Sequence, residues 1–195
     1  MQTMFWVNKL GKSLVLFLLG LWVIGPVYAN VDTPWVKSKG GQVHLQMADG
    51  TVYALTLNAD VEGVFYDRDK HPVKGDNYIS LFQASPSNRA NPTGLCGAGN
   101  EIWLYVYQVT GAELVEKTKS LVSSCLHSIS MTSQNSGASG QDRDFSSVQW
   151  NSRGFSIEWF DHVDAAGRSL KLSNFMVQDG DFVQQDVLIQ NNPKN

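Results

Sequence analysis

Two cysteines bracket the most strand-like stretch of this 195-residue chain and constrain its fold more than any other feature. Cys96 precedes the apolar run 102–109, Cys125 follows it after a charged connection, and the chain has no third cysteine. A Cys96–Cys125 disulfide is therefore expected if the protein leaves the reducing cytoplasm, and a loop of this length would stabilise the fold by roughly 3–4 kcal/mol. The alternative is a reactive thiol at Cys125 paired with His127.

The N-terminus indicates export. Residues 1–29 contain two lysines, then an apolar core at 14–24, and then Val27-Tyr28-Ala29, which fits a signal-peptide cleavage site. The core is shorter than the ~20 residues that a membrane-spanning helix needs. We therefore expect a cleaved signal peptide at 1–29, a single secreted β-rich domain at 30–195, a periplasmic or secreted location and no stable membrane anchor after cleavage.

The charge of the chain limits its partners. The whole sequence has 15 basic and 18 acidic residues, and loss of the predicted signal removes two lysines and no acidic residue. Nucleic acid and anionic membrane surfaces both attract clustered Lys and Arg, so neither suits this acidic domain. A cationic protein partner suits it better, although the same charge is also typical of an ordinary soluble surface.

Alternating apolar and polar residues predict antiparallel strands along most of the mature chain. The runs 43–47 and 51–57 are joined by Asp49-Gly50, which is a good hairpin signal. The segment 112–120 fits either a short helix or a strand with charged edges. The sequence predicts an all-β fold with roughly eight to ten strands and room for one short helix, built as an antiparallel sandwich or partly open barrel with one disulfide.

The segment 121–144, which contains Cys125, gives two further expectations. Leu121, Cys125, Ile129 and Met131 fall on one face of an alternating run, which predicts that Cys125 lies inside a sheet. The following stretch, 132–144, is polar and rich in glycine and serine, which indicates a mobile connection.

The apolar run between the cysteines contains the candidate ligand-binding residues. Trp103, Tyr105 and Tyr107 share one face of the predicted strand, and aliphatic side chains share the other. Such a strand is either covered on both sides or exposes its aromatic face. Exposed aromatic rings stack on sugar rings, so this row is a candidate carbohydrate site, and burial of the row in the core is the alternative.

No catalytic or cofactor motif is apparent. Asp67, Asp69, His71 and Asp76 share one polar loop, but the loop lacks the glycine and glutamate positions of a calcium loop. The glycines around Cys96 precede a strand, whereas a phosphate loop needs a helix there. We therefore predict no catalytic residues, no metal and no cofactor.

These features favour a non-catalytic periplasmic protein-binding module. More specifically, we expect an inhibitor or immunity-type protein that neutralises an envelope-acting enzyme. Export, small size, a crosslinked scaffold and a net negative charge are all consistent with this function. The first alternative is a carbohydrate- or cell-wall-binding module that uses the aromatic strand face. The second is a hydrolase whose catalytic residues are dispersed along the chain.

Overall fold

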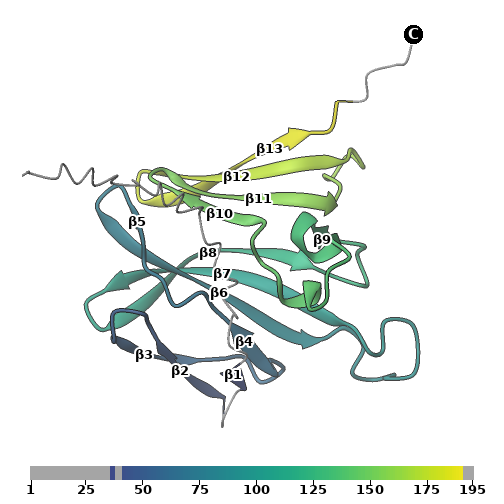
Figure 1. Ribbon diagram of the computed structural model, residues 1–195, viewed down its shortest axis with the longest axis horizontal. Helices are drawn as coiled ribbons and strands as arrows, with labels where there is room; N and C mark the ends of the chain where they lie inside the picture. Colours follow the sequence, from purple (N-terminus) through teal and green to yellow (C-terminus); the bar gives the residue numbers. More distant parts are fainter. Residues whose placement is uncertain (1–35, 38–40, 191–195) are drawn as a thin grey trace, which may run out of the picture. The chain divides into compact units, whose positions relative to one another are not determined.

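The computed structural model describes residues 36–37 and 41–190, all within one unit, Val31–Asn195 (Figure 1). The predicted signal peptide lies outside the described residues. The described residues form β-strands and two short 3-10 helices, and they contain no α-helix. In chain order the elements are β1 (Val36–Lys37), β2 (Gln42–Gln46), β3 (Val52–Thr56), β4 (Gly63–Phe65), β5 (His71–Val73), β6 (Asp76–Pro86), β7 (Asn100–Thr110), β8 (Glu113–Ser123), β9 (Ser130–Met131), η1 (Thr132–Asn135), η2 (Gln141–Arg143), β10 (Val148–Asn151), β11 (Gly154–Asp161), β12 (Leu170–Gln178) and β13 (Asp181–Leu188).

The strands form three antiparallel sheets. A six-stranded sheet has the order β1-β4-β6-β7-β8, and β5 also pairs with β6. A five-stranded sheet has the order β10-β11-β12-β13, and β9 also pairs with β11. The hairpin β2–β3 is the third sheet, and its register pairs Val43 with Leu55. The prediction of an all-β antiparallel fold with one disulfide is confirmed.

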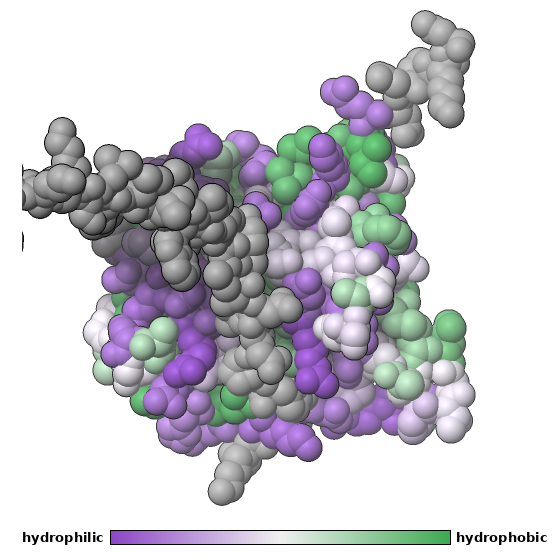
Figure 2. Space-filling model, in the orientation of Figure 1, coloured by the Kyte–Doolittle hydropathy of each residue, from purple (hydrophilic) through white to green (hydrophobic). Residues whose placement is uncertain are grey.

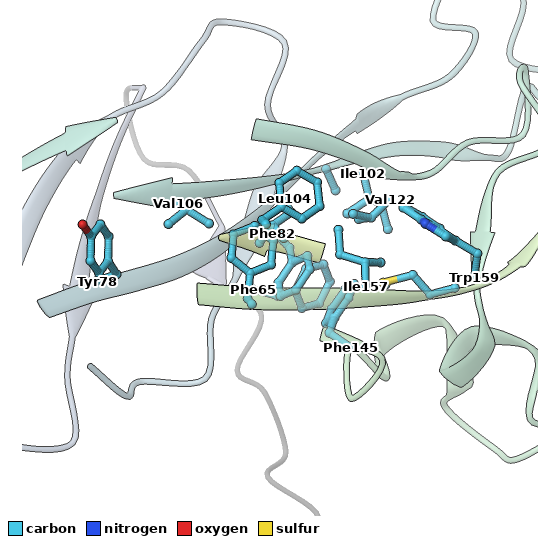
Figure 3. Close-up of a cluster of buried hydrophobic side chains, with 14 of the residues drawn as sticks. Phe65, Tyr78, Phe82, Ile102, Leu104, Val106, Val122, Phe145, Ile157 and Trp159 are labelled. Atoms are coloured by element: carbon cyan, nitrogen blue, oxygen red, sulfur yellow. The ribbon is translucent and has the colours of Figure 1, made fainter. Parts of the chain in front are cut away.

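The six-stranded and five-stranded sheets pack face to face around an aromatic-rich core (Figure 3). Phe82 and Phe145 stack with ring centroids 3.8 Å apart, and Phe155 and Phe175 stack at 4.5 Å. Strand β7 contributes its aliphatic face, which consists of Ile102, Leu104 and Val106. Two sheets with their inner faces interdigitated form the sandwich that the sequence predicts.

The hairpin β2–β3 covers the opposite face of the six-stranded sheet, so that this sheet is the middle of three layers (Figure 1). The second core lies in this interface and combines residues of the hairpin with residues of β4, β6 and β7. Its buried members include Val43, Leu45, Met47, Tyr53, Val64, Ile79, Leu81, Tyr105 and Tyr107. Both faces of β7 are therefore buried, which explains why the run 102–109 is almost wholly apolar.

Three local expectations change in the structure. The ambiguous segment 112–120 enters strand β8 at Glu113, and Lys117 on this edge strand lies 3.0 Å from the Asp181 carboxylate of β13. Cys125 does not lie inside a sheet, because β8 ends at Ser123 and residues 125–128 form an exposed turn closed by Ser124 and Ile129. No regular element was predicted for the stretch 132–144, and the structure contains η1 and η2 there.

Candidate functional site

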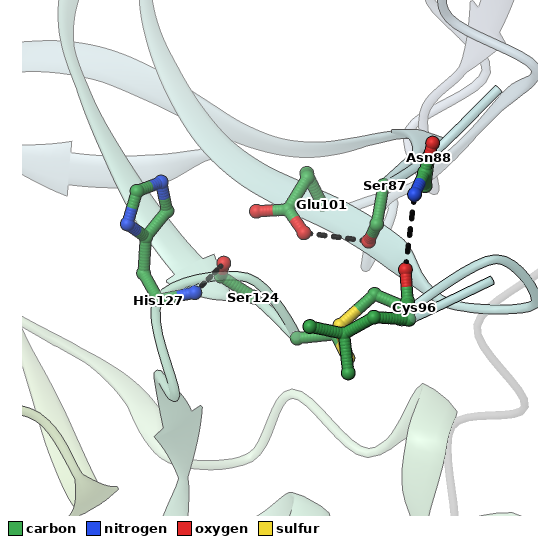
Figure 4. The surroundings of a disulfide bond; sticks show 8 residues. Ser87, Asn88, Cys96, Glu101, Ser124 and His127 are labelled. Atoms are coloured by element: carbon green, nitrogen blue, oxygen red, sulfur yellow. Dashed lines mark hydrogen bonds between the residues drawn. A yellow bond between two sulfur atoms is a disulfide. The ribbon is translucent and has the colours of Figure 1, made fainter. Parts of the chain in front are cut away.

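The Cys96–Cys125 disulfide joins two loops at the same end of the six-stranded sheet (Figure 4). Cys96 lies in the loop between β6 and β7, Cys125 lies in the turn after β8, and their Cα atoms are 5.7 Å apart. Since β7 pairs with β6 and with β8, the crosslink connects the loop before β7 to the turn that follows the neighbouring strand β8. The predicted pairing is confirmed, and it leaves no free thiol among the described residues.

The loop 87–99 is held by its own backbone. The N–H of Ser87 donates to the carbonyl of Gly99 over 2.9 Å and closes the loop at its base. Within the loop, the N–H groups of Asn91, Gly94 and Gly97 each donate to the carbonyl three residues earlier. This succession of turns, together with the disulfide, restrains the backbone of the loop.

Gly97 makes this folding possible. A Cβ atom at this position would lie 2.2 Å from the carbonyl oxygen of Pro92, which is backbone and cannot move aside easily. The side chain of Asn88 adds a second restraint, because its Nδ2 donates to the carbonyl of Leu95 over 3.1 Å. The glycine-rich sequence around Cys96 therefore supports a tightly turned loop beside the disulfide, as expected.

Each cysteine has an exposed leucine beside it. Leu95 is 83% exposed and Leu126 is 49% exposed, although most large apolar residues of the domain are buried. We call this pair the leucine rim. Figure 2 shows hydrophobic surface at the right-hand edge of the view, over the loop that follows β6 in Figure 1. The rim presents apolar side chains from two loops that one covalent bond holds together.

The polar residues around the disulfide do not form a catalytic triad (Figure 4). The hydroxyl of Ser87 donates to the carboxylate of Glu101 over 2.5 Å, so no histidine activates it. The hydroxyl of Ser124 accepts the backbone N–H of His127 over 2.9 Å, which caps the turn. Among the described residues the His127 ring has no hydrogen-bond partner, so these side chains support the loops and show no nucleophile–base pair.

A cavity of about 720 Å³ lies next to the disulfide. Its walls come from the ends of β4, β6, β7 and β8, from the loops that contain the two cysteines, and from both 3-10 helices. The lining residues are Phe65, Ala84, Ala98, Gly99, Asn100, Ile102, Ser123, Ser124, Cys125, Ile129, Ser130, Gln134, Asn135, Gln141, Asp142 and Arg143. Its volume is in the range of ligand pockets, and its lining combines an apolar part with several polar side chains.

Gln134 is the most unusual residue of this cavity. It is only 8% exposed, its Nε2 donates to the carbonyl of Asp142 over 3.4 Å, and its Oε1 is buried without a hydrogen-bond partner. A buried carbonyl oxygen without a donor is destabilising, so this atom marks a place where the fold leaves an acceptor unused.

The aromatic row is mostly buried. Tyr105 is 9% exposed and Tyr107 is 5% exposed, and Trp103 packs partly buried against the same core. Burial raises the pKa of both tyrosines, and the Tyr107 hydroxyl accepts a hydrogen bond from Gln83 Nε2 over 3.2 Å. The Lys119 ammonium lies 5.7 Å from the Trp103 ring centroid. Trp103, Tyr105 and Tyr107 therefore do not form the exposed aromatic face on which the candidate carbohydrate site was based.

Other polar clusters have structural roles in this fold. His71 Nε2 lies 2.8 Å from the Asp67 carboxylate, and its ring stacks on Trp150 at 4.4 Å. Burial lowers the pKa of His162, whose ring contacts Trp159 edge-on. Within the described part of the chain, no group of three or more His, Cys, Asp or Glu side chains could hold a metal ion.

The comparisons with known proteins provide no assignment. No family model, no curated protein and no solved structure matches this chain. No helix within residues 36–37 and 41–190 is long and apolar enough to cross a membrane.

The leucine rim and the cavity are the two features that sequence reasoning missed. A signal for the rim was present, because an apolar residue stood beside each cysteine in a stretch otherwise rich in glycine, serine and asparagine. No comparable signal existed for the cavity, since its walls come from segments that are far apart in the sequence.

Proposed function

We propose that this protein is a non-catalytic binding protein of an extracytoplasmic compartment, and that it recognises a protein partner through the leucine rim. The single observation that supports the proposal best is the 83% exposure of Leu95 on a loop that is closed at its base and crosslinked at the neighbouring Cys96. A large apolar side chain on a fixed loop is costly in water and becomes favourable when a partner pocket covers it.

The rigidity of the loop supports this proposal energetically. Binding normally costs conformational entropy because loops and side chains become ordered at the interface. Here the backbone bonds of loop 87–99 and the disulfide have already ordered the backbone that carries Leu95. A partner would therefore order little more than the two leucine side chains, so the part of the binding cost that comes from loop ordering would be small.

The disulfide is typical of proteins outside the reducing cytoplasm, and a periplasmic location follows if residues 1–29 act as an export signal. An inhibitor or immunity-type protein against an envelope-acting enzyme is the concrete form of the proposal. Such proteins need a rigid surface that can fill a pocket, and they need no catalytic groups of their own. The acidic balance of the domain favours a cationic partner.

The test is partner capture with a matched set of variants. The exported protein carries an affinity tag and is recovered from the periplasm as wild type, as L95D, as L126D and as V52D. Val52 is an exposed apolar residue on β3, remote in sequence and sheet from the disulfide, so V52D controls for the added charge. We expect one stoichiometric partner with wild type and V52D, and at least a tenfold weaker interaction with L95D.

The proposal also predicts a functional readout. If the captured partner is an enzyme, purified wild-type protein should reduce its activity at a one-to-one ratio, and L95D should need a much higher concentration. Capture that is equal for wild type and L95D, with both proteins folded by circular dichroism, would show that the rim is not the contact surface.

A further inference from the structure

We infer that the cavity beside the disulfide is a binding site for an N-acetylated amino sugar. This inference is independent of the leucine rim, because it concerns a different surface and a different class of ligand. It rests on three properties of the lining: an apolar floor, a buried acceptor, and several polar side chains, the last two without hydrogen-bond partners in the part of the chain that the structure describes.

The floor of the cavity is apolar and belongs to the rigid part of the fold. Ala84 and Ile102 come from the central strands β6 and β7, and Ile129 follows the disulfide-linked turn. Since β6 and β7 are paired from Ala84 and Ile102 in both directions along the sheet, these side chains are held in place by it. A small apolar group such as the methyl of an acetamido substituent can pack here without a rearrangement of the backbone.

Gln134 supplies the acceptor for the amide of such a substituent. Its Oε1 has no donor, and the single hydrogen bond of its side chain within the described residues is the 3.4 Å contact from Nε2 to the carbonyl of Asp142. That contact is at the long end of the usual range and restrains the terminal amide only weakly, so the inference requires the amide to turn Oε1 towards the cavity when the ligand binds. An acetamido N–H beside a methyl group is the pattern that complements a carbonyl oxygen beside an apolar floor.

The remaining polar groups suit a ring with hydroxyl substituents. The side chains of Asn100, Ser123 and Ser130 line the cavity and make no hydrogen bond within the described residues. Hydroxyl and amide groups can both donate and accept, as sugar hydroxyls do. The cavity also contains Asp142 and Arg143, whose opposite charges cancel, so the site suits an uncharged ligand better than an ion.

The experiment is a titration of the isotope-labelled exported protein, followed by NMR and calorimetry. The probe is N,N′-diacetylchitobiose, and cellobiose is the matched ligand because it lacks the acetamido groups. N-acetyl-alanyl-alanine amide is a third probe, since it has the amide and methyl groups without the sugar ring. We expect diacetylchitobiose to shift the side-chain amide of Gln134, and both other probes to bind at least tenfold more weakly.

Variants then assign the effect to the cavity. Q134L removes the buried acceptor and should weaken diacetylchitobiose binding at least tenfold, and S130A should weaken it severalfold. S156A, on the outer face of the five-stranded sheet, is the matched control and should bind as wild type does. Q134L removes the unsatisfied Oε1 and also the 3.4 Å hydrogen bond from Nε2 to the carbonyl of Asp142, so we expect its melting temperature to stay close to that of wild type.

Three results would overturn the inference: no shift at the cavity with diacetylchitobiose, equal binding of cellobiose, or tighter binding of the peptide probe.

The proposed sugar site and the proposed leucine rim can be disproved separately. If L95D loses its protein partner but binds diacetylchitobiose normally, both proposals stand, whereas a Q134L protein that binds both as wild type does contradicts only the cavity. Co-sedimentation with purified cell-wall sacculi then distinguishes a cell-wall source of the sugar from a soluble one.

Discussion

The two faces of strand β7 are both buried, but partners of very different size cover them. The face with Leu104 packs against a five-stranded sheet, whereas the face with Tyr105 and Tyr107 packs against the two-stranded hairpin β2–β3. A hairpin of two strands is marginally stable by itself, so its position depends on the core beneath it. The same strand thus belongs to a strong interface on one side and to a weaker, more adaptable one on the other.

Polar contacts fasten the hairpin to the chain that follows β4. The N–H of Ala48 donates to the carbonyl of Arg68 over 2.8 Å, and Arg68 Nε donates to the carbonyl of Gln46 over 3.0 Å. At the hairpin turn, the Lys70 ammonium lies 2.7 Å from the Asp49 carboxylate. These contacts hold one end of the hairpin, and apolar packing holds the rest.

The comparison is tested most strongly by two matched leucines. Leu104 faces the five-stranded sheet and Leu81 faces the hairpin, and both are fully buried. Replacement of a buried leucine by alanine typically costs about 3–5 kcal/mol, and less where the surroundings can collapse into the cavity. We expect L104A to lie near the upper end of that range and L81A to be about 1–2 kcal/mol less destabilised, because the hairpin can move inward.

Urea denaturation of the two variants, followed by tryptophan fluorescence, measures this difference. Hydrogen exchange then tests its cause, since L81A should increase exchange mainly in β2 and β3, and L104A should affect the whole domain. Equal free energies of unfolding and equal exchange patterns would show that the two layers form one cooperative unit, and the proposed difference between the faces would be wrong.

The second prediction concerns the buried polar contact on the hairpin side. Y107F removes the acceptor of Gln83 Nε2 and leaves a buried donor unpaired, which should cost about 1–3 kcal/mol at neutral pH. In the double variant Y107F/Q83L both polar groups are absent, so most of that loss should be recovered. Recovery is measured as the difference in urea midpoint between the single and double variants.

The buried hydroxyl of Tyr107 also predicts that the stability of the fold depends on pH. Burial raises its pKa above the usual 10.0, so the protonated hydroxyl is favoured in the folded state. The resulting stabilisation is complete below the unfolded pKa of about 10 and is lost as the pH rises towards the higher folded pKa. Wild-type protein should lose stability more steeply than Y107F above pH 10, and identical slopes would contradict a buried hydroxyl.

The smallest expected change in stability comes from the Asp49–Lys70 pair at the turn of hairpin β2–β3. The hydrogen bond from Lys70, with a further contribution from Thr51, lowers the pKa of Asp49. A lowered carboxyl pKa stabilises the fold above pH 3.8, the usual pKa of the group, and the stabilisation is lost as the pH falls towards the lower pKa of the folded state. D49N should lower the melting temperature slightly at pH 7 and low salt, with no difference from wild type in 1 M salt because the pair is exposed.

The strand pattern of the fold was largely readable from the sequence. Alternation predicted the hairpin around Asp49-Gly50 and the opposite directions of Leu104 and Tyr105, and the structure confirms both. The prediction that Cys125 lies inside a sheet was wrong. The alternation of apolar and polar residues continues through the turn that contains Cys125, where Leu126 and His127 are exposed. Period-two patterns identify the faces of a strand but do not show where pairing stops.

The candidate sites were much less predictable. Whether the aromatic row is exposed depends on the hairpin β2–β3, which lies about 50 residues earlier in the chain and has no sequence signal that shows which face it covers. The cavity depends on the approach of η1 and η2 to the ends of β6 and β7. Such long-range packing is decided by the whole fold, so burial and cavities could not be derived from local patterns.

The position of the disulfide also determines the order in which parts of the domain can be completed. The crosslink encloses only β7, β8 and their connections, and its partners are 29 positions apart. All strands of the six-stranded sheet and both cysteines precede β9 to β13 in the chain. They are therefore the first to become available for folding when the chain is delivered starting with its N-terminus. If the chain is exported N-terminus first, both cysteines reach the oxidising compartment before the second sheet does, so the disulfide can close the middle layer before that sheet packs on it.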